Sequence, residues 1–66
     1  MTFLKIGQLV QFHSTLLRHD ATGTIYKHNL NSCTIEITEC NLDDKERVHV
    51  LNNRIIISNK DILSLK

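Results

Sequence analysis

Histidine and cysteine side chains are the groups in this 66-residue chain that could bind a metal ion. Closed zinc sites in small proteins usually show a C-x-x-C pair, or two histidines roughly three to five residues apart. The six candidates, which are His13, His19, His28, His49, Cys33 and Cys40, contain no C-x-x-C pair, and without one the histidine spacing does not indicate a closed site. The sequence therefore predicts no metal site and no cofactor. It favours a buried role for Cys33, because a free cysteine often packs as a small hydrophobe.

A nucleophilic enzyme needs a serine or cysteine beside a base, in a pocket that excludes water. The chain offers the pairs Cys40–His49 and Ser14–His13, but 66 residues leave little room for an enclosed pocket. The acidic run at residues 43–46 lacks the spacing of a calcium loop, and it is interpreted as part of a solvated loop. We therefore expect no catalytic residues and no small-molecule substrate.

The small net charge bears directly on nucleic-acid binding. Eight Lys and Arg residues against seven Asp and Glu residues give a formal charge of +1, which excludes a strongly basic nucleic-acid-binding arm. Protonation of the four histidines, below the pH of about 6.5 at which free histidine titrates, would raise this charge. One open alternative is therefore an RNA- or DNA-binding face on which Tyr26 stacks against a base. The residues of that face would be Tyr26, Lys27 and His28, with His13, and with Arg18 and His19 on a loop at residues 14–20.

Leucines outside the expected core favour a protein partner instead. The alternation of the strands and the position of the loop predict partial exposure of Leu9, Leu16, Leu17, Leu30 and Leu51. Small domains commonly gain buried area by self-association, so these leucines are interpreted as a surface for a protein partner or for a second copy of the chain. The favoured function is a non-enzymatic binding or assembly module, and a dimer is one form it could take.

Composition and alternation predict that the chain is a small β protein, whose strands and turns position the candidate residues. Branched isoleucine, valine and threonine side chains are abundant, whereas alanine occurs once and proline is absent. Apolar and polar residues alternate as in half-buried strands at residues 8–13, 22–28 and 32–38. The six asparagines are expected to form turns, because asparagine tolerates positive φ.

The second half of the chain is predicted to add two or three strands. Residues 40–46 are interpreted as a loop, with a short helical turn led by Asn41 as an alternative. Residues 47–51 are predicted to form a strand with Val48 and Val50 inward, and Asn52 and Asn53 to form a two-residue turn. A strand at residues 54–57, a helical turn at residues 58–61 and a closing strand at residues 62–65 complete the sheet.

Five or six short antiparallel strands in a single domain of residues 1–66 favour a small open barrel, because a curled sheet hides its edges around one core. The expected core residues are Ile6, Val10, Phe12, Ile25, Cys33, Ile35, Ile37, Val48, Ile55 or Ile56, Ile57 and Ile62. No apolar stretch reaches the length of about 18 residues that a membrane span needs, and the start lacks the pattern of a signal peptide. A cytoplasmic location with reduced thiols is therefore expected.

Several fragments resemble SH3-like barrels of the KOW and Tudor type. The segment I-G-Q-L-V-Q-F at residues 6–12 is similar to their entry strand, and G-T-I at residues 23–25 is similar to their second strand. Residues 55–63 look like the strand, short helical turn and last strand that complete such barrels. The resemblance implies an all-β, SH3-like open barrel with a one-turn helix before the last strand.

Residues 6–65 also resemble a family of short bacterial proteins typified by YkvS. The similarity rests on Gly7, Val10 and Phe12, on T-G-T-I at residues 22–25, on N-S-C-T-I-E-I at residues 31–37, and on residues 55–61. Many members carry an aromatic residue near the end, where this chain has Ile62. The resemblance implies the barrel fold and a bacterial protein, and it implies no catalytic or binding residues.

Overall fold

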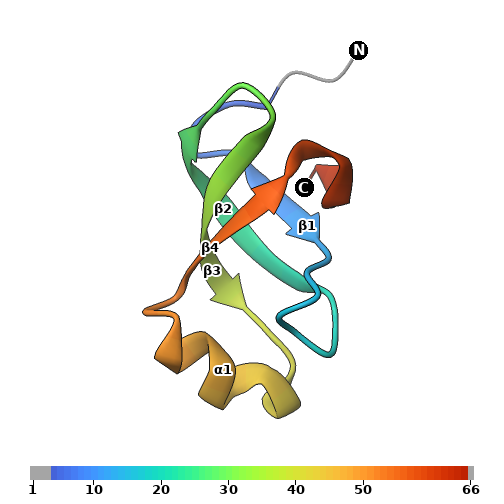
Figure 1. Cartoon of the computed structure of the whole chain (residues 1–66), viewed down its shortest axis with the longest axis vertical. Helices are drawn as coiled ribbons and strands as arrows, with labels where there is room; N and C mark the ends of the chain where they lie inside the picture. Colours follow the sequence, from blue (N-terminus) through green and yellow to red (C-terminus); the bar gives the residue numbers. More distant parts are fainter. Residues whose placement is uncertain (1–3, 66) are drawn as a thin grey trace.

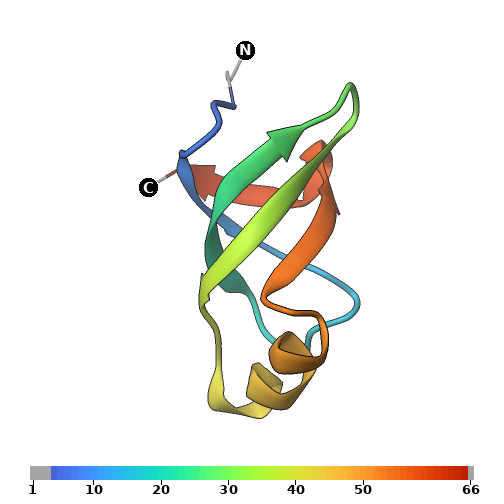
Figure 2. The same ribbon diagram turned by 90° about the vertical axis from the view of Figure 1, so that its left-hand side faces the viewer.

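The chain folds around one antiparallel sheet whose strand order is β4-β3-β2-β1-β5. A computed structural model describes residues 4–65. Along the chain lie β1 (Leu9–Phe12), β2 (Ala21–His28), β3 (Ser32–Glu39), the 3-10 helix η1 (Leu42–Asp44), α1 (Lys45–Val50), β4 (Arg54–Ser58), the 3-10 helix η2 (Asn59–Asp61) and β5 (Ile62–Leu65). The sheet curls so that α1 lies at one end of the molecule and the β2–β3 turn at the other (Figures 1 and 2). This confirms the predicted all-β fold, a small open barrel with five antiparallel strands and a short helical turn before the last one.

Alternating burial positions the two long strands, β2 and β3. Odd-numbered residues of β3 are buried up to Ile37, and the residues between them are partly or fully exposed. Gly23 of β2 is buried where the backbone of β3 comes very close. A Cβ atom at position 23 would lie 2.6 Å from Cγ2 of Ile35 and closer still to the carbonyl oxygen of Glu36. Glycine therefore allows β2 and β3 to pack closely at this point.

The buried core follows most of the predicted residues. It consists, within residues 4–65, of Val10, Phe12, Leu17, Ala21, Ile25, Cys33, Ile35, Ile37, Val48, Ile55 and Ile57. The sequence left open whether Ile55 or Ile56 of β4 lies in the core. The structure buries Ile55 and leaves Ile56 69% exposed. The prediction for Ile6 is wrong: a turn in which the Gln8 N–H donates to the carbonyl of Lys5 leaves Ile6 outside the barrel. Ile62 is half-buried and packs against the edge of the core.

The strand predicted at residues 47–51 is wrong, because these residues belong largely to α1. Val48 is buried, whereas Val50 is 67% exposed. Residues two apart share one face of a strand, but on a helix they point about 200° apart. Leu51, three residues after Val48, packs against the core as helical spacing requires. The loop predicted at residues 40–46 is also replaced, by η1 and the start of α1, and the Asn41 side chain caps η1 by accepting the Asp43 N–H.

Two consecutive asparagines end the helix and lead into β4. Asn52 and Asn53 have φ values of 57° and 62°, which confirms their predicted place in a turn. The Asn53 N–H donates to the carbonyl of Val48 at 2.9 Å, and the Asn53 carbonyl accepts from the Ile37 N–H at 2.6 Å. The turn thereby ties α1 to β3. None of the helices within residues 4–65 has the length and hydropathy needed to cross a membrane.

Candidate functional site

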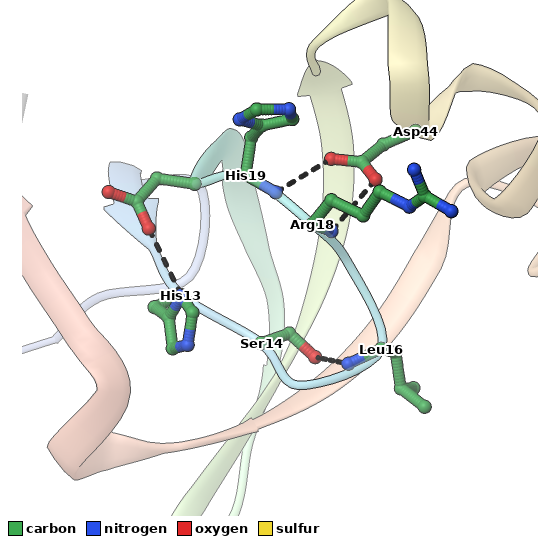
Figure 3. Close-up of polar contacts among 7 residues, drawn as sticks. His13, Ser14, Leu16, Arg18, His19 and Asp44 are labelled. Carbon is green, nitrogen blue, oxygen red and sulfur yellow. Dashed lines mark hydrogen bonds and ion pairs between the residues drawn. The ribbon is translucent and has the colours of Figure 1, made fainter.

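The loop between β1 and β2, residues 13–20, has a fixed conformation (Figure 3). The buried Ser14 hydroxyl accepts a hydrogen bond from the Leu16 N–H at 3.1 Å, and the Ser14 carbonyl accepts from the Leu17 N–H at 3.1 Å. This turn places Leu17 in the core, so the prediction that Leu17 is partly exposed is wrong. Leu16 instead points outward from the loop and is 52% exposed, as predicted.

A buried carboxylate holds the other half of the loop. Asp44, at the end of η1, accepts the Arg18 N–H at 2.8 Å with Oδ1 and the His19 N–H at 3.0 Å with Oδ2 (Figure 3). The hydrogen bond from Arg18 is the main cause that lowers the pKa of the Asp44 carboxyl; burial opposes it, and the His19 N–H and both positive charges add to the lowering. The interpretation of residues 43–46 as a solvated acidic loop is therefore wrong for Asp44, which is 2% exposed.

Two histidine–aspartate pairs lie along the same loop. His13 Nδ1 is 3.1 Å from Asp20 Oδ1, which joins the two ends of the loop. His19 Nε2 is 3.1 Å from Asp43 Oδ2, which joins the loop to η1. All four side chains are about half-exposed. Two of the predicted binding histidines thus have carboxylate partners within the chain and serve to hold the loop.

An open groove of about 720 Å³ lies between this loop and α1, and we call it the loop–helix groove. Leu16 and Val50 supply its exposed apolar surface. The complete lining is Thr15, Leu16, Leu17, Arg18, Asp43, Asp44, Glu46, Arg47 and Val50. Within residues 4–65, the guanidinium groups of Arg18 and Arg47 form no ion pair, whereas Asp43 and Asp44 are already engaged by the loop. The groove therefore offers apolar contacts next to two guanidinium groups that have no ion pair among the described residues.

The predicted residues on β2 lie elsewhere. β1 pairs with β2 only as far as Thr24, so the end of β2 extends beyond β1 toward the β2–β3 turn, away from α1 (Figure 1). Tyr26, Lys27 and His28 are all exposed there, and Arg54 of β4 places its Cζ atom 4.5 Å from the centre of the Tyr26 ring. Five residues of strand, about 17 Å, separate Tyr26 from the start of β2 at the loop. The structure thus divides the six predicted residues into two separate groups.

The remaining predicted residues have mixed outcomes. Leu9 and Leu30 are exposed, and Leu51 is partly exposed while it packs against the core, all as predicted. Cys33 lies in the core, where burial raises the pKa of its thiol and its Sγ donates to Asn59 Oδ1 at 3.2 Å. Cys40 and His49 line one shallow hollow of about 340 Å³ between β3 and α1. Across the described residues, no three histidine, cysteine or acidic side chains gather as a metal site would require.

Sequence reasoning missed the residues that α1 and η1 bring to the loop–helix groove, namely Asp44, Glu46, Arg47 and Val50. The signal that could have found them is the spacing of Val48 and Leu51 after an Asn41 cap, which is helical. Comparisons of the chain with protein-family models, curated proteins and solved structures return no match. The resemblance to the YkvS-like family therefore stays a prediction.

Proposed function

We propose that this chain is a non-enzymatic binding module that holds an extended segment of a partner protein in the loop–helix groove. The observation that carries the proposal is Leu16, an exposed apolar side chain on a loop held in one conformation by hydrogen bonds from both of its halves. A preformed loop loses little conformational entropy on binding. Leu16 can therefore act as an anchor at low entropic cost.

The composition of the groove supports a protein segment as its ligand. Interfaces gain most of their affinity from a few side chains that are desolvated together, and arginine is prominent among them. Leu16 and Val50 lie in the same groove as Arg18 and Arg47. This pattern fits an extended segment that places an apolar side chain between the loop and α1.

The charges of the groove narrow the chemistry of the partner. Asp44 is used by the loop backbone and Asp43 by His19, which leaves Glu46 as the acidic side chain with no hydrogen bond or ion pair among the described residues. Arg18 and Arg47 are both available to a ligand carboxylate, and arginine binds carboxylates in a bidentate way. The expected ligand therefore carries an apolar residue next to an aspartate or glutamate.

Selection from random peptides of about 12 residues, displayed on phage, tests the proposal. We expect the wild-type chain to enrich peptides with an apolar residue beside an acidic one. Leu16→Ser and Arg47→Glu should each weaken the binding of a selected peptide by about tenfold or more, because each removes a central contact. Fluorescence anisotropy with the labelled peptide measures the change.

Leu30→Ser is the matched control, because Leu30 is 90% exposed near the β2–β3 turn, away from the groove. It should leave the affinity unchanged. Circular dichroism of each variant checks that it remains folded. An absence of enriched peptides, or an equal loss of affinity in Leu30→Ser, would contradict the proposal.

Nucleic-acid binding is the second candidate function, and it has an observation of its own. The stacked pair of Tyr26 and Arg54 lies beside Lys27 and His28 on an exposed part of β2. Aromatic and arginine planes of this kind can stack on the bases of single strands. Binding of a single-stranded RNA that falls steeply with salt and is lost in Tyr26→Ala would support this candidate. RNA binding that changes neither with salt nor in Tyr26→Ala would contradict this candidate.

A further inference from the structure

β4 is one end of the sheet, and its outer edge has no strand beside it within residues 4–65. Its sequence is Arg54-Ile55-Ile56-Ile57-Ser58, with one charge. Its pairing with β3 is regular, without a bulge. Natural proteins usually protect sheet edges with charges, proline or bulges, because an open edge pairs with other strands. Protection of this kind is slight in β4, which suits it for pairing with a further strand.

Hydrogen bonds at the two ends of β4 show which backbone groups face outward. The Asn53 carbonyl accepts from the Ile37 N–H at 2.6 Å, and the Asn59 N–H donates to the carbonyl of Asn31 at 3.0 Å. Because successive residues of a strand alternate in direction, the odd-numbered residues of β4 bond to β3 and the even-numbered ones face away from it. The Arg54 N–H is used by the carbonyl of Leu51, at 3.2 Å. The Ser58 carbonyl is at the N-cap of η2, where it accepts the first hydrogen bond of that helix. The outward groups that remain are the Arg54 carbonyl, the Ile56 N–H and carbonyl, and the Ser58 N–H.

From this edge we propose that two copies of the chain form a homodimer through antiparallel pairing of β4 with β4, centred on Ile56. In this register Ile56 of each copy lies opposite Ile56 of the other and exchanges two hydrogen bonds with it. The Ser58 N–H of each copy donates to the Arg54 carbonyl of the other. All the outward groups are thereby satisfied around one twofold axis. The inference goes beyond the proposed function, because it rests on the backbone of β4 and not on the loop–helix groove.

Side chains beside the edge favour a second copy as the occupant. Ile56 is 69% exposed and lines an apolar groove of about 450 Å³ with Leu16, Leu51 and Ile55. The twofold axis brings two such apolar surfaces to the same interface. Arg54 lies opposite Ser58 of the other copy, so no like charges face each other along the ladder, and a net charge of +1 gives two copies little mutual repulsion.

Ser58→Pro tests the pairing while leaving the β3 side of β4 intact. Ser58 has φ −62° and ψ 142°, which proline adopts without strain, and the one backbone donor that the substitution removes is an outward N–H. The wild-type chain should be a dimer in reversible equilibrium with monomer by sedimentation velocity. Ser58→Pro should raise the dimer dissociation constant by roughly thirtyfold, because each dimer loses two hydrogen bonds.

Ser58→Ala is the control for this substitution. The Ser58 hydroxyl caps η2 by accepting the Lys60 N–H at 3.4 Å, and both variants lose that cap, but only Ser58→Pro loses the outward N–H. Ser58→Ala should therefore dimerise like the wild type. A wild-type chain that stays monomeric up to about 1 mM would overturn the proposal. So would equal dissociation constants for the two variants, since the ladder would then not form.

Cysteine cross-linking tests the register in a Cys40→Ser background, in which Cys33 is buried. Ile56→Cys places two thiols opposite each other at a Cα separation of about 5.5 Å, which suits a disulfide. Leu63→Cys, on β5 and comparably exposed at 52%, is the control. Faster disulfide formation by Ile56→Cys supports the proposal, and equal rates overturn it. If the chain dimerises but Ile56→Cys and Leu63→Cys form disulfides at equal rates, the dimer uses another surface. If the chain is monomeric and Ser58→Pro no longer binds the peptide selected from the phage library, the β4 edge binds that peptide and not a second copy.

Discussion

At the scale of single residues, Asp44 determines where the binding loop lies. Its two oxygens accept two consecutive backbone N–H groups, from Arg18 and His19, that would otherwise lack partners within residues 4–65. Asp44 also lines the loop–helix groove. A buried acidic group is stable only when it is satisfied in this way. One side chain thus links the stability of the fold to the geometry of the candidate site.

The lowered pKa of Asp44 predicts a specific dependence of stability on pH. The hydrogen bond from Arg18 stabilises the carboxylate, so the folded chain binds a proton less readily than the unfolded chain. The stabilisation by Asp44 is therefore present above its ordinary pKa and is lost as the pH falls through the lowered value. Urea unfolding between about pH 5 and pH 2 should show that the difference in the free energy of unfolding between the wild type and Asp44→Asn shrinks as the pH falls.

Asp43→Asn is the control for this measurement. Asp43 is also in η1, but it is exposed and pairs only with the half-exposed His19 side chain. Over the acid range, the free energy of unfolding of Asp43→Asn should depend on pH more nearly as the wild type does than that of Asp44→Asn. If the two variants converge on the wild type in the same way, the hydrogen bonds to the loop backbone do not control the acid sensitivity.

At the scale of elements, alternation allowed the strands to be predicted and concealed the helix. β2 and β3 are half-buried over eight residues each, so their pattern is long enough to fix both type and face. α1 has six residues and buries one of them, Val48, which alternates with Val50 as it would in a strand. Its contact with the core through Leu51 depends on tertiary packing. A short helix is therefore mistaken for a strand when the alternation of two residues is considered without the cap and the three-residue spacing around them.

The same reason explains why most of the candidate site was not predicted. Of the six residues expected to bind a partner, Arg18 lies in the loop–helix groove, because the loop itself was identified. The opposite wall of the groove comes from α1, which the sequence did not predict. Leu17 is buried and Leu16 exposed because Ser14 forms a turn in which it accepts the Leu16 and Leu17 N–H groups, and a hydrophobic periodicity does not reveal such a turn.

Substitution of the two valines of α1 distinguishes the helix from the predicted strand. Val48→Ala should lower the free energy of unfolding by about 2 kcal/mol, because it leaves a cavity in the core. Val50→Ala should change it by less than about 0.5 kcal/mol, because Val50 is 67% exposed. Urea denaturation measures both values. Equal losses would mean that both side chains face inward, as in a strand.

At the scale of the whole molecule, β2 is the strand on which both sides of the barrel depend. It pairs with β1 on one side and with β3 on the other, and Gly23 lies opposite Val10 and Ile37 at once. Within residues 4–65, β5 has β1 as its one hydrogen-bonded strand neighbour, and β4 has β3. A chain of 66 residues has one core and buries only about 60% of its unfolded surface, so it has no second unit that could stay folded if β2 moved.

Gly23→Ala should therefore destabilise the entire fold in one transition. The added Cβ would meet Ile35 and the backbone of Glu36, so β2 and β3 must separate, and the free energy of unfolding should fall by about 2 kcal/mol. Thr24→Ala, at the adjacent half-exposed position, should cost about 1 kcal/mol or less. Fluorescence of Tyr26 and far-ultraviolet circular dichroism should follow the same urea curve in both variants, because both sides of the barrel share β2. Separate transitions in Gly23→Ala would show instead that β1 with β5 and β3 with β4 unfold independently.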